Sequence, residues 1–149
     1  MSLLARLKDA LGESSTSTAD PARARQIAAA VLMLAMAHAD FEHDQVEFAE
    51  IKNQLQTQFD LSAVEADELI AQAQSKSQQS VSLYPYLKVL NDGMSLQDKR
   101  QVLEMLWRVA YADQQLDPRE ENLMRELADL LYLPHREFIR AKLSVLGNE

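Results

Sequence analysis

The spacing of apolar positions along the chain predicts helices from end to end. Apolar residues recur every three or four positions, as they do on one face of an α-helix. No segment keeps the alternation of a half-buried strand, so we expect no sheet. The predicted helices cover about 2–11, 21–39, 44–59, 62–76, 83–91, 95–110, 117–131 and 134–146, with a loop at 75–82. The predicted fold class is therefore all-α.

Several helix starts carry a residue that can cap the free amides of a first turn. These predicted caps are Asp20, Asp44, Ser62, Ser95 and Asp117. A glutamate three positions later completes a capping box at Glu47, Glu65 and Glu120. The helix after Asp20 is apolar almost all round from Ile27, which predicts a central place in the core. The helix after Ser95 is expected to be the second central helix.

The chain also repeats itself. An offset of 73 residues places Asp40 on Asp113, Asp44 on Asp117 and Glu47 on Glu120, and after a one-residue slip Leu61 meets Leu133. We interpret about 22–76 and 95–146 as two copies of a three-helix unit, joined by the short helix at 83–91. Each copy alone would leave an apolar face bare, so we expect the two to pack about a pseudo-two-fold axis. That symmetry would bring the two acidic turns near each other.

The N-terminal region has a different pattern. Leu3, Leu4, Leu7 and Leu11 share one face of a short amphipathic helix over 1–12, and residues 13–20 have the small polar composition of a flexible linker. The remaining residues, 21–149, form the helical domain. The N-terminal helix has three open roles: packing on its own domain, docking on a protein partner, or peripheral contact with a membrane through residues 2–11.

Composition narrows the functional classes. The 149 residues are 47% hydrophobic, which suits one globular domain, and the net charge is −8. Such acidity disfavours binding of nucleic acid, where affinity comes largely from neutralised phosphates. The chain has no cysteine, which excludes disulfides and thiol chemistry. No signal peptide and no apolar run of membrane-spanning length are recognisable, so we expect a cytoplasmic protein.

The acidic turns hold the candidate chemistry. Asp44, Asp117, Glu47 and Glu120 have a sufficient explanation as caps, but Asp40 and Asp113 follow the carboxyl ends of the two central helices, where the helix dipole disfavours an anion. Their partner could be backbone amides of the turn, a protein, or a divalent cation, for which oxygen ligands suit Ca²⁺, Mg²⁺ or Mn²⁺. The spacing is not that of an EF-hand loop. The candidate metal ligands are Asp40, Asp44, Glu47, Asp113, Asp117 and Glu120.

Known catalytic patterns are missing from the sequence. There is no Gly-x-Ser-x-Gly elbow, no glycine-rich phosphate loop and no His-Glu-x-x-His motif. We therefore expect a protein that works by binding and is not an enzyme.

Residues 106–143, "LWRVAYADQQLDPREENLMRELADLLYLPHREFIRAKL", resemble the TerB-like domains of tellurite resistance, particularly the stand-alone bacterial group. "AHAD" at 37–40 looks like the first acidic turn of that family, and the resemblance extends over about 22–145. It implies an all-helical pseudo-symmetric bundle, an association with tellurite or chemical-stress resistance, and a metal site at the six acidic residues. Family members usually place glycine after the first aspartate of each turn, where Phe41 and Gln114 stand here.

Two functional hypotheses remain. The first is a non-enzymatic TerB-like accessory module with a divalent-cation site at the paired acidic turns. The second is a protein-interaction adaptor whose acidic turns are only helix caps, with the 2–11 helix or a groove between the repeats as its docking surface. Under either hypothesis we expect a protein partner.

Overall fold

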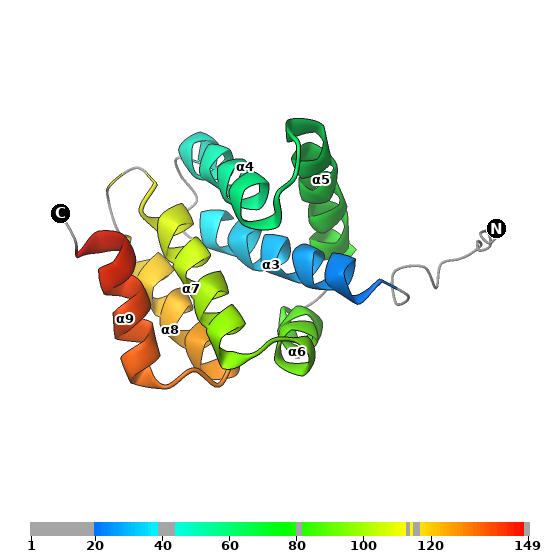
Figure 1. Ribbon diagram of the computed structural model, residues 1–149. Helices are drawn as coiled ribbons and strands as arrows, with labels where there is room; N and C mark the ends of the chain where they lie inside the picture. The colour runs from blue at the N-terminus through cyan, green and yellow to red at the C-terminus, as the bar shows by residue number, and fades with distance from the viewer. Residues whose placement is uncertain (1–19, 39–43, 80–81, 113, 115–116, 148–149) are drawn as a thin grey trace.

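The computed structural model describes residues 20–38, 44–79, 82–112, 114 and 117–147 (Figure 1). The predicted N-terminal helix at 1–12 and the linker up to residue 19 lie outside these residues. Within the described part every regular element is an α-helix and no strand occurs, which confirms the all-α class. The helices are α3 (Pro21–His38), α4 (Asp44–Phe59), α5 (Ala63–Gln79), α6 (Tyr84–Gly93), α7 (Leu96–Ala110), α8 (Pro118–Leu130) and α9 (His135–Leu146).

The predicted loop at 75–82 was wrong over its first half, because α5 continues to Gln79. Its last turns are rich in serine and glutamine and mostly exposed, so they lack the apolar spacing from which a helix is predicted. Tertiary contact supports this end instead. The Tyr86 hydroxyl in α6 donates a hydrogen bond to the Lys76 carbonyl oxygen at 3.0 Å.

The caps predicted for α3, α5 and α7 are present with good geometry. The Asp20 carboxylate accepts from an amide in the first turn of α3 at 3.2 Å. Ser62 and Glu65 form a reciprocal box, with distances of 3.1 Å to the Ser62 hydroxyl and 2.9 Å to the Glu65 carboxylate. The Ser95 hydroxyl accepts from the Asp98 amide at 3.1 Å. These caps fix where α3, α5 and α7 begin.

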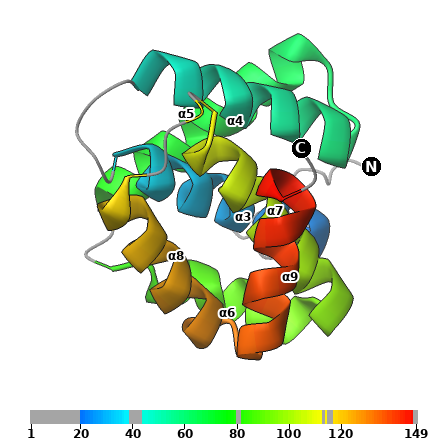
Figure 2. The ribbon, with the colours of Figure 1, turned by 90° about the vertical axis from the view of Figure 1, so that its left-hand side faces the viewer.

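Helix α3 lies at the centre of the bundle, as its all-round apolar sequence predicts. Every residue from Ile27 to Leu34 is buried, and so are Met36 and Ala37. The helix contacts α4, α5, α6, α7 and α8 (Figures 1 and 2). Because α3 touches helices on all sides, it needs no polar face along this stretch.

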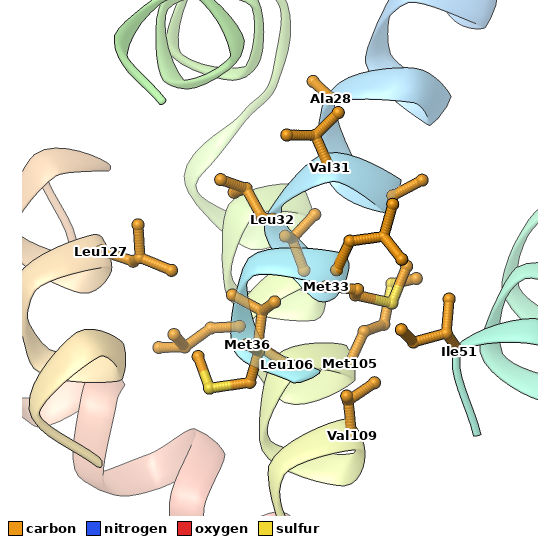
Figure 3. Packing of buried hydrophobic residues seen from close by; sticks show 14 of the residues in the cluster. Ala28, Val31, Leu32, Met33, Met36, Ile51, Met105, Leu106, Val109 and Leu127 are labelled. Atoms are coloured by element: carbon orange, nitrogen blue, oxygen red, sulfur yellow. The ribbon is translucent and has the colours of Figure 1, made fainter. Parts of the chain in front are cut away.

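Helix α7 packs against α3 and forms the second centre of the core. Met105, Leu106 and Val109 lie beside the α3 side chains in Figure 3, with Ile51 approaching from α4 and Leu127 from α8. Helix α7 also contacts α9. An ion pair joins these two helices, with 3.0 Å between the Arg100 guanidinium and the buried Glu137 carboxylate.

A buried lysine joins the ends of three helices. Lys99 of α7 is only 8% exposed, and its ammonium donates to the Leu131 carbonyl oxygen at 2.8 Å and to the Asn91 side-chain oxygen at 3.2 Å. Asn91 of α6 in turn donates to the Leu130 carbonyl oxygen at 3.0 Å. These bonds satisfy carbonyl groups at the carboxyl end of α8, where intrahelical donors run out.

Helices α4 and α8 end in the same way. Asp60 and Tyr132 both have a left-handed backbone, with φ of 58° and 61°. The next amide, of Leu61 or Leu133, bonds the carbonyl oxygen five residues earlier, at 3.1 Å and 3.0 Å respectively. This is the Schellman ending of a helix. Leu61 and Leu133 are the residues that the sequence repeat aligns after its one-residue slip, although the symmetry of the whole arrangement stays a prediction.

Candidate functional site

The structure describes three of the six predicted metal ligands in full. Glu47, Asp117 and Glu120 are placed with their side chains, whereas Asp44 is described only as the first residue of α4. Asp40 and Asp113 lie outside the described residues. The geometry of the second acidic turn therefore rests on Asp117, Glu120 and their neighbours.

Asp117 and Glu120 form the predicted capping box at the start of α8. The Glu120 carboxylate accepts from the Asp117 amide at 3.4 Å, while the Asp117 carboxylate accepts from the Arg119 amide at 2.7 Å. Pro118 stands at the first helical position, where a missing amide hydrogen has no cost. The expected structural role of these two acids is thus confirmed.

The side chain of Arg119 also binds the Asp117 carboxylate. Its guanidinium donates twice to the Asp117 carboxylate, both times at 3.1 Å. These side-chain hydrogen bonds, followed by the bond from the Arg119 amide, lower the pKa of Asp117 below its ordinary value. The folded protein therefore favours the charged form of this carboxylate.

The lowered pKa of Asp117 predicts an acid-dependent loss of stability. A carboxylate whose pKa is lower in the folded state stabilises the fold above its unfolded pKa of about 3.9, and loses that contribution as the pH falls through the folded value. The wild type should therefore exceed Asp117→Asn in free energy of unfolding at pH 6, and the gap should close as the pH falls through the folded pKa of Asp117. Urea denaturation across this pH range measures the gap. Asp129→Asn serves as a control with an exposed carboxyl, and a gap that is constant with pH would contradict the prediction.

Glu47 and Glu120 are both completely buried, with 0% of each side chain exposed. They stand 73 residues apart, each one turn into a helix that follows an acidic turn. Sequence reasoning assigned both as caps and did not predict this burial. Carboxylates removed from water are held by hydrogen bonds, by opposite charge or by a metal ion. The sequence signal available for this burial was that both glutamates occupy the same position of the repeat, one turn inside a helix.

Gln114, which follows Asp113, has a left-handed backbone with φ of 65°. Its amide bonds the Tyr111 carbonyl oxygen at 2.9 Å, so the chain turns tightly after α7. Glycine adopts this conformation without steric cost, and a residue with a side chain does so less readily. The conformation for which glycine is suited thus occurs here with glutamine in its place.

Among the described residues, no three His, Asp or Glu side chains gather closely enough to hold a metal ion. The side chains of Asp40, Asp44 and Asp113 lie outside the described part of the chain. The described part of the chain also contains no helix that is long and apolar enough to cross a membrane.

Comparison with known proteins gives one match. The family model described as "Tellurite resistance protein TerB" matches residues 26–143, which include both acidic turns and every helix from α3 to α8 apart from the first residues of α3. Searches of curated proteins and of solved structures gave no match.

Proposed function

Because the chain belongs to the family of the tellurite resistance protein TerB, we propose that it is a non-enzymatic accessory module that binds a divalent cation at its two acidic turns. The link to tellurite or chemical-stress resistance follows from the family alone. The cation site is argued from the residues of the turns.

The observation that carries the proposal is the matched burial of Glu47 and Glu120. Each lies one turn after an aspartate at the start of its helix, and in the sequence each turn begins with another aspartate soon after a central helix. A cation at these turns would offset both the cost of burying a carboxylate and the repulsion between Asp40 or Asp113 and the helix dipole. Carboxylate-only ligand sets favour Ca²⁺, Mg²⁺ or Mn²⁺.

The packing of the helices supports treating the two turns as a pair. Helices α3 and α7 contact each other, α4 crosses to contact α7, and α8 crosses to contact α3. A pseudo-two-fold axis between the predicted copies would produce these reciprocal contacts. The matching Schellman endings of α4 and α8 agree with it.

The two turns should differ in affinity. Arg119 neutralises Asp117 in the second turn, whereas the corresponding position in the first turn is Val46, which is 47% exposed. A cation must compete with the guanidinium at Asp117, whereas Val46 brings no charge to the first turn. We therefore expect tighter binding at the first turn, and tighter binding at the second turn once Arg119 is replaced by valine.

Titration with Ca²⁺, Mg²⁺ and Mn²⁺ tests the proposal, with amide chemical shifts (line broadening for Mn²⁺) and Tm as readouts. Shifts should be confined to residues near 39–47 and 112–120, and a cation at 100 times its Kd should add about 2.7 kcal/mol to the free energy of unfolding. The Asp40→Asn/Asp113→Asn variant should lose both effects. Asp60→Asn/Asp92→Asn is the matched control and should keep them. No localised shift at millimolar concentrations of all three cations would refute the cation site.

A second candidate function has its own support. The Asp117 and Glu120 side chains already serve the capping box and the ion pair with Arg119. If the turns are caps alone, the protein is better described as an adaptor that docks on a protein partner through an apolar surface. In that case Asp40→Asn/Asp113→Asn would leave partner binding unchanged while substitutions at the apolar surface would abolish it.

A further inference from the structure

Helices α6 and α8 border a groove, which we call the α6–α8 groove, with a mainly apolar larger part and a smaller part that also carries polar side chains. It consists of two hollows of about 240 Å³ and 150 Å³. Tyr84, Leu87 and Leu130 line both hollows, so the hollows adjoin. Leu123 and Leu127 of α8 also line the larger hollow.

Large apolar side chains are unusually exposed around this groove. Tyr84 is 67% exposed, Leu130 43% and Tyr132 74%, and they are three of the seven large exposed hydrophobic residues in the described part of the chain. Tyr132 also keeps a left-handed backbone, which is rare for an aromatic residue. Apolar surface concentrated in a groove marks a binding surface more often than scattered apolar residues do.

We propose that residues 2–11 of this chain dock as an amphipathic helix into the α6–α8 groove. Leu4, Leu7 and Leu11 follow the spacing with which a helix presents anchors to an apolar groove. Leucine side chains on successive helical turns would enter the two adjoining hollows. Docking would cover the exposed side chains of Tyr84 and Leu130 and bury the leucines at the same time.

Charge favours the same assignment. On a helical wheel, Arg6 and Lys8 flank the leucine stripe on opposite sides. The groove carries Glu126 in its α8 wall, and in its α6 wall the ion pair of Lys88 with Asp92, whose charged atoms are 2.7 Å apart. Glu126 makes no ion pair with any described residue. One basic residue beside the stripe would therefore face the Glu126 carboxylate, and the other would lie beside the Lys88–Asp92 pair.

Residues 13–19, which connect residues 2–11 to α3, are long enough for residues 2–11 to reach the α6–α8 groove. A Cβ at Gly93, the last residue of α6, would lie 3.2 Å from the Arg25 guanidinium, so α6 ends against the first turns of α3. Residues 13–19 can span up to about 25 Å, whereas the ten residues of α6 extend about 15 Å. A short tether of this kind gives an effective concentration of roughly millimolar. A segment whose free Kd is about 0.1 mM would then be docked in about nine molecules of ten.

Disulfide trapping in the full chain tests the docking, and the absence of native cysteine makes the result unambiguous. The Leu7→Cys/Leu130→Cys variant, at low micromolar concentration under mild oxidation, should form an intramolecular disulfide at least tenfold faster than Leu7→Cys/Val64→Cys. Val64 is the matched control because it is 65% exposed near the start of α5, away from the groove. Electrophoresis without reductant separates the products.

Equal rates in the two variants would overturn the proposal. Disulfide-linked dimers as the main product would also overturn it, because they would place a second copy in the groove. An independent measurement avoids any effect of Leu130→Cys on the groove itself. Leu4→Asp/Leu7→Asp should shift the amide resonances of residues lining the α6–α8 groove, whereas the control Asp9→Asn should not, and unchanged groove resonances in the first variant would contradict docking.

Discussion

Replacing Trp107 with alanine is expected to lower the free energy of unfolding by about 3–5 kcal/mol. The side chain of Trp107 has no exposed surface, its ring centre lies 5.3 Å from that of Phe138, and the Lys142 ammonium lies 5.6 Å from the ring centre. Alanine would leave a cavity between α7 and α9 that neighbouring side chains fill only in part. For a domain of this size the Tm should fall by about 10 °C.

Urea denaturation followed by circular dichroism measures this loss, since Trp107 is the single tryptophan and its removal takes away the fluorescence signal. Val64→Ala is the control, because Val64 lies away from the α6–α8 groove. Its side chain is 65% exposed, so we expect a change of no more than about 0.5 kcal/mol. A loss below about 1 kcal/mol for Trp107→Ala would mean that the ring does not fill the core in solution.

The second large effect is expected at Lys99. Methionine can keep the packing of the aliphatic stem, but it removes the charged donor from the Leu131 carbonyl oxygen and from the Asn91 side chain. A hydrogen bond from a charged group contributes about 1.5–3 kcal/mol, and a buried acceptor left without its donor is costly. We expect Lys99→Met to lower the free energy of unfolding by about 2–3 kcal/mol.

Lys88→Met provides the comparison for Lys99→Met. Lys88 pairs with Asp92 at 2.7 Å on the exposed face of α6, where solvent screens the pair, so its removal should change the free energy of unfolding far less. The same denaturation experiment serves both variants. If the two changes proved equally small, the ammonium of Lys99 would not hold the end of α8.

The parts of the fold that sequence predicts best are those in which local and global preferences agree. Helix α3 is apolar on every side, and it is the central helix. The cap residues Asp20, Ser62 and Ser95 mark three helix starts because a capping bond involves only neighbouring residues. Asp117 and Glu120 were predicted for the same reason.

Features that depend on distant segments were not predicted. The burial of Lys99 follows from the arrival of α6 and α8 at one end of α7, and no local pattern records it. The last turns of α5 are helical although their sequence has no apolar spacing, with Tyr86 bonded to the carbonyl of Lys76. The α6–α8 groove likewise joins residues about 40 positions apart.

In the candidate site, too, local features were predicted from the sequence and features that depend on distant segments were not. Local chemistry predicted the capping roles of Asp117 and Glu120, and the sequence repeat paired Glu47 with Glu120. Full burial of both glutamates comes from tertiary packing. The bonds from Arg119 that lower the pKa of Asp117 are local, since the two residues are only two positions apart. The metal ligand set as a whole stays a prediction, since Asp40 and Asp113 lie outside the described residues.

The central position of α3 has a consequence for how the protein folds. Helix α3 belongs to the first predicted copy, yet it packs against α7 and α8 of the second. The two predicted copies therefore share one hydrophobic core, and we expect them to melt together. A fragment that contained only α7, α8 and α9 would expose the α3-facing side chains of Met105, Leu106 and Val109. We therefore expect one cooperative unfolding transition for the described helices, with the docking of α3 on α7 joining segments far apart in the sequence.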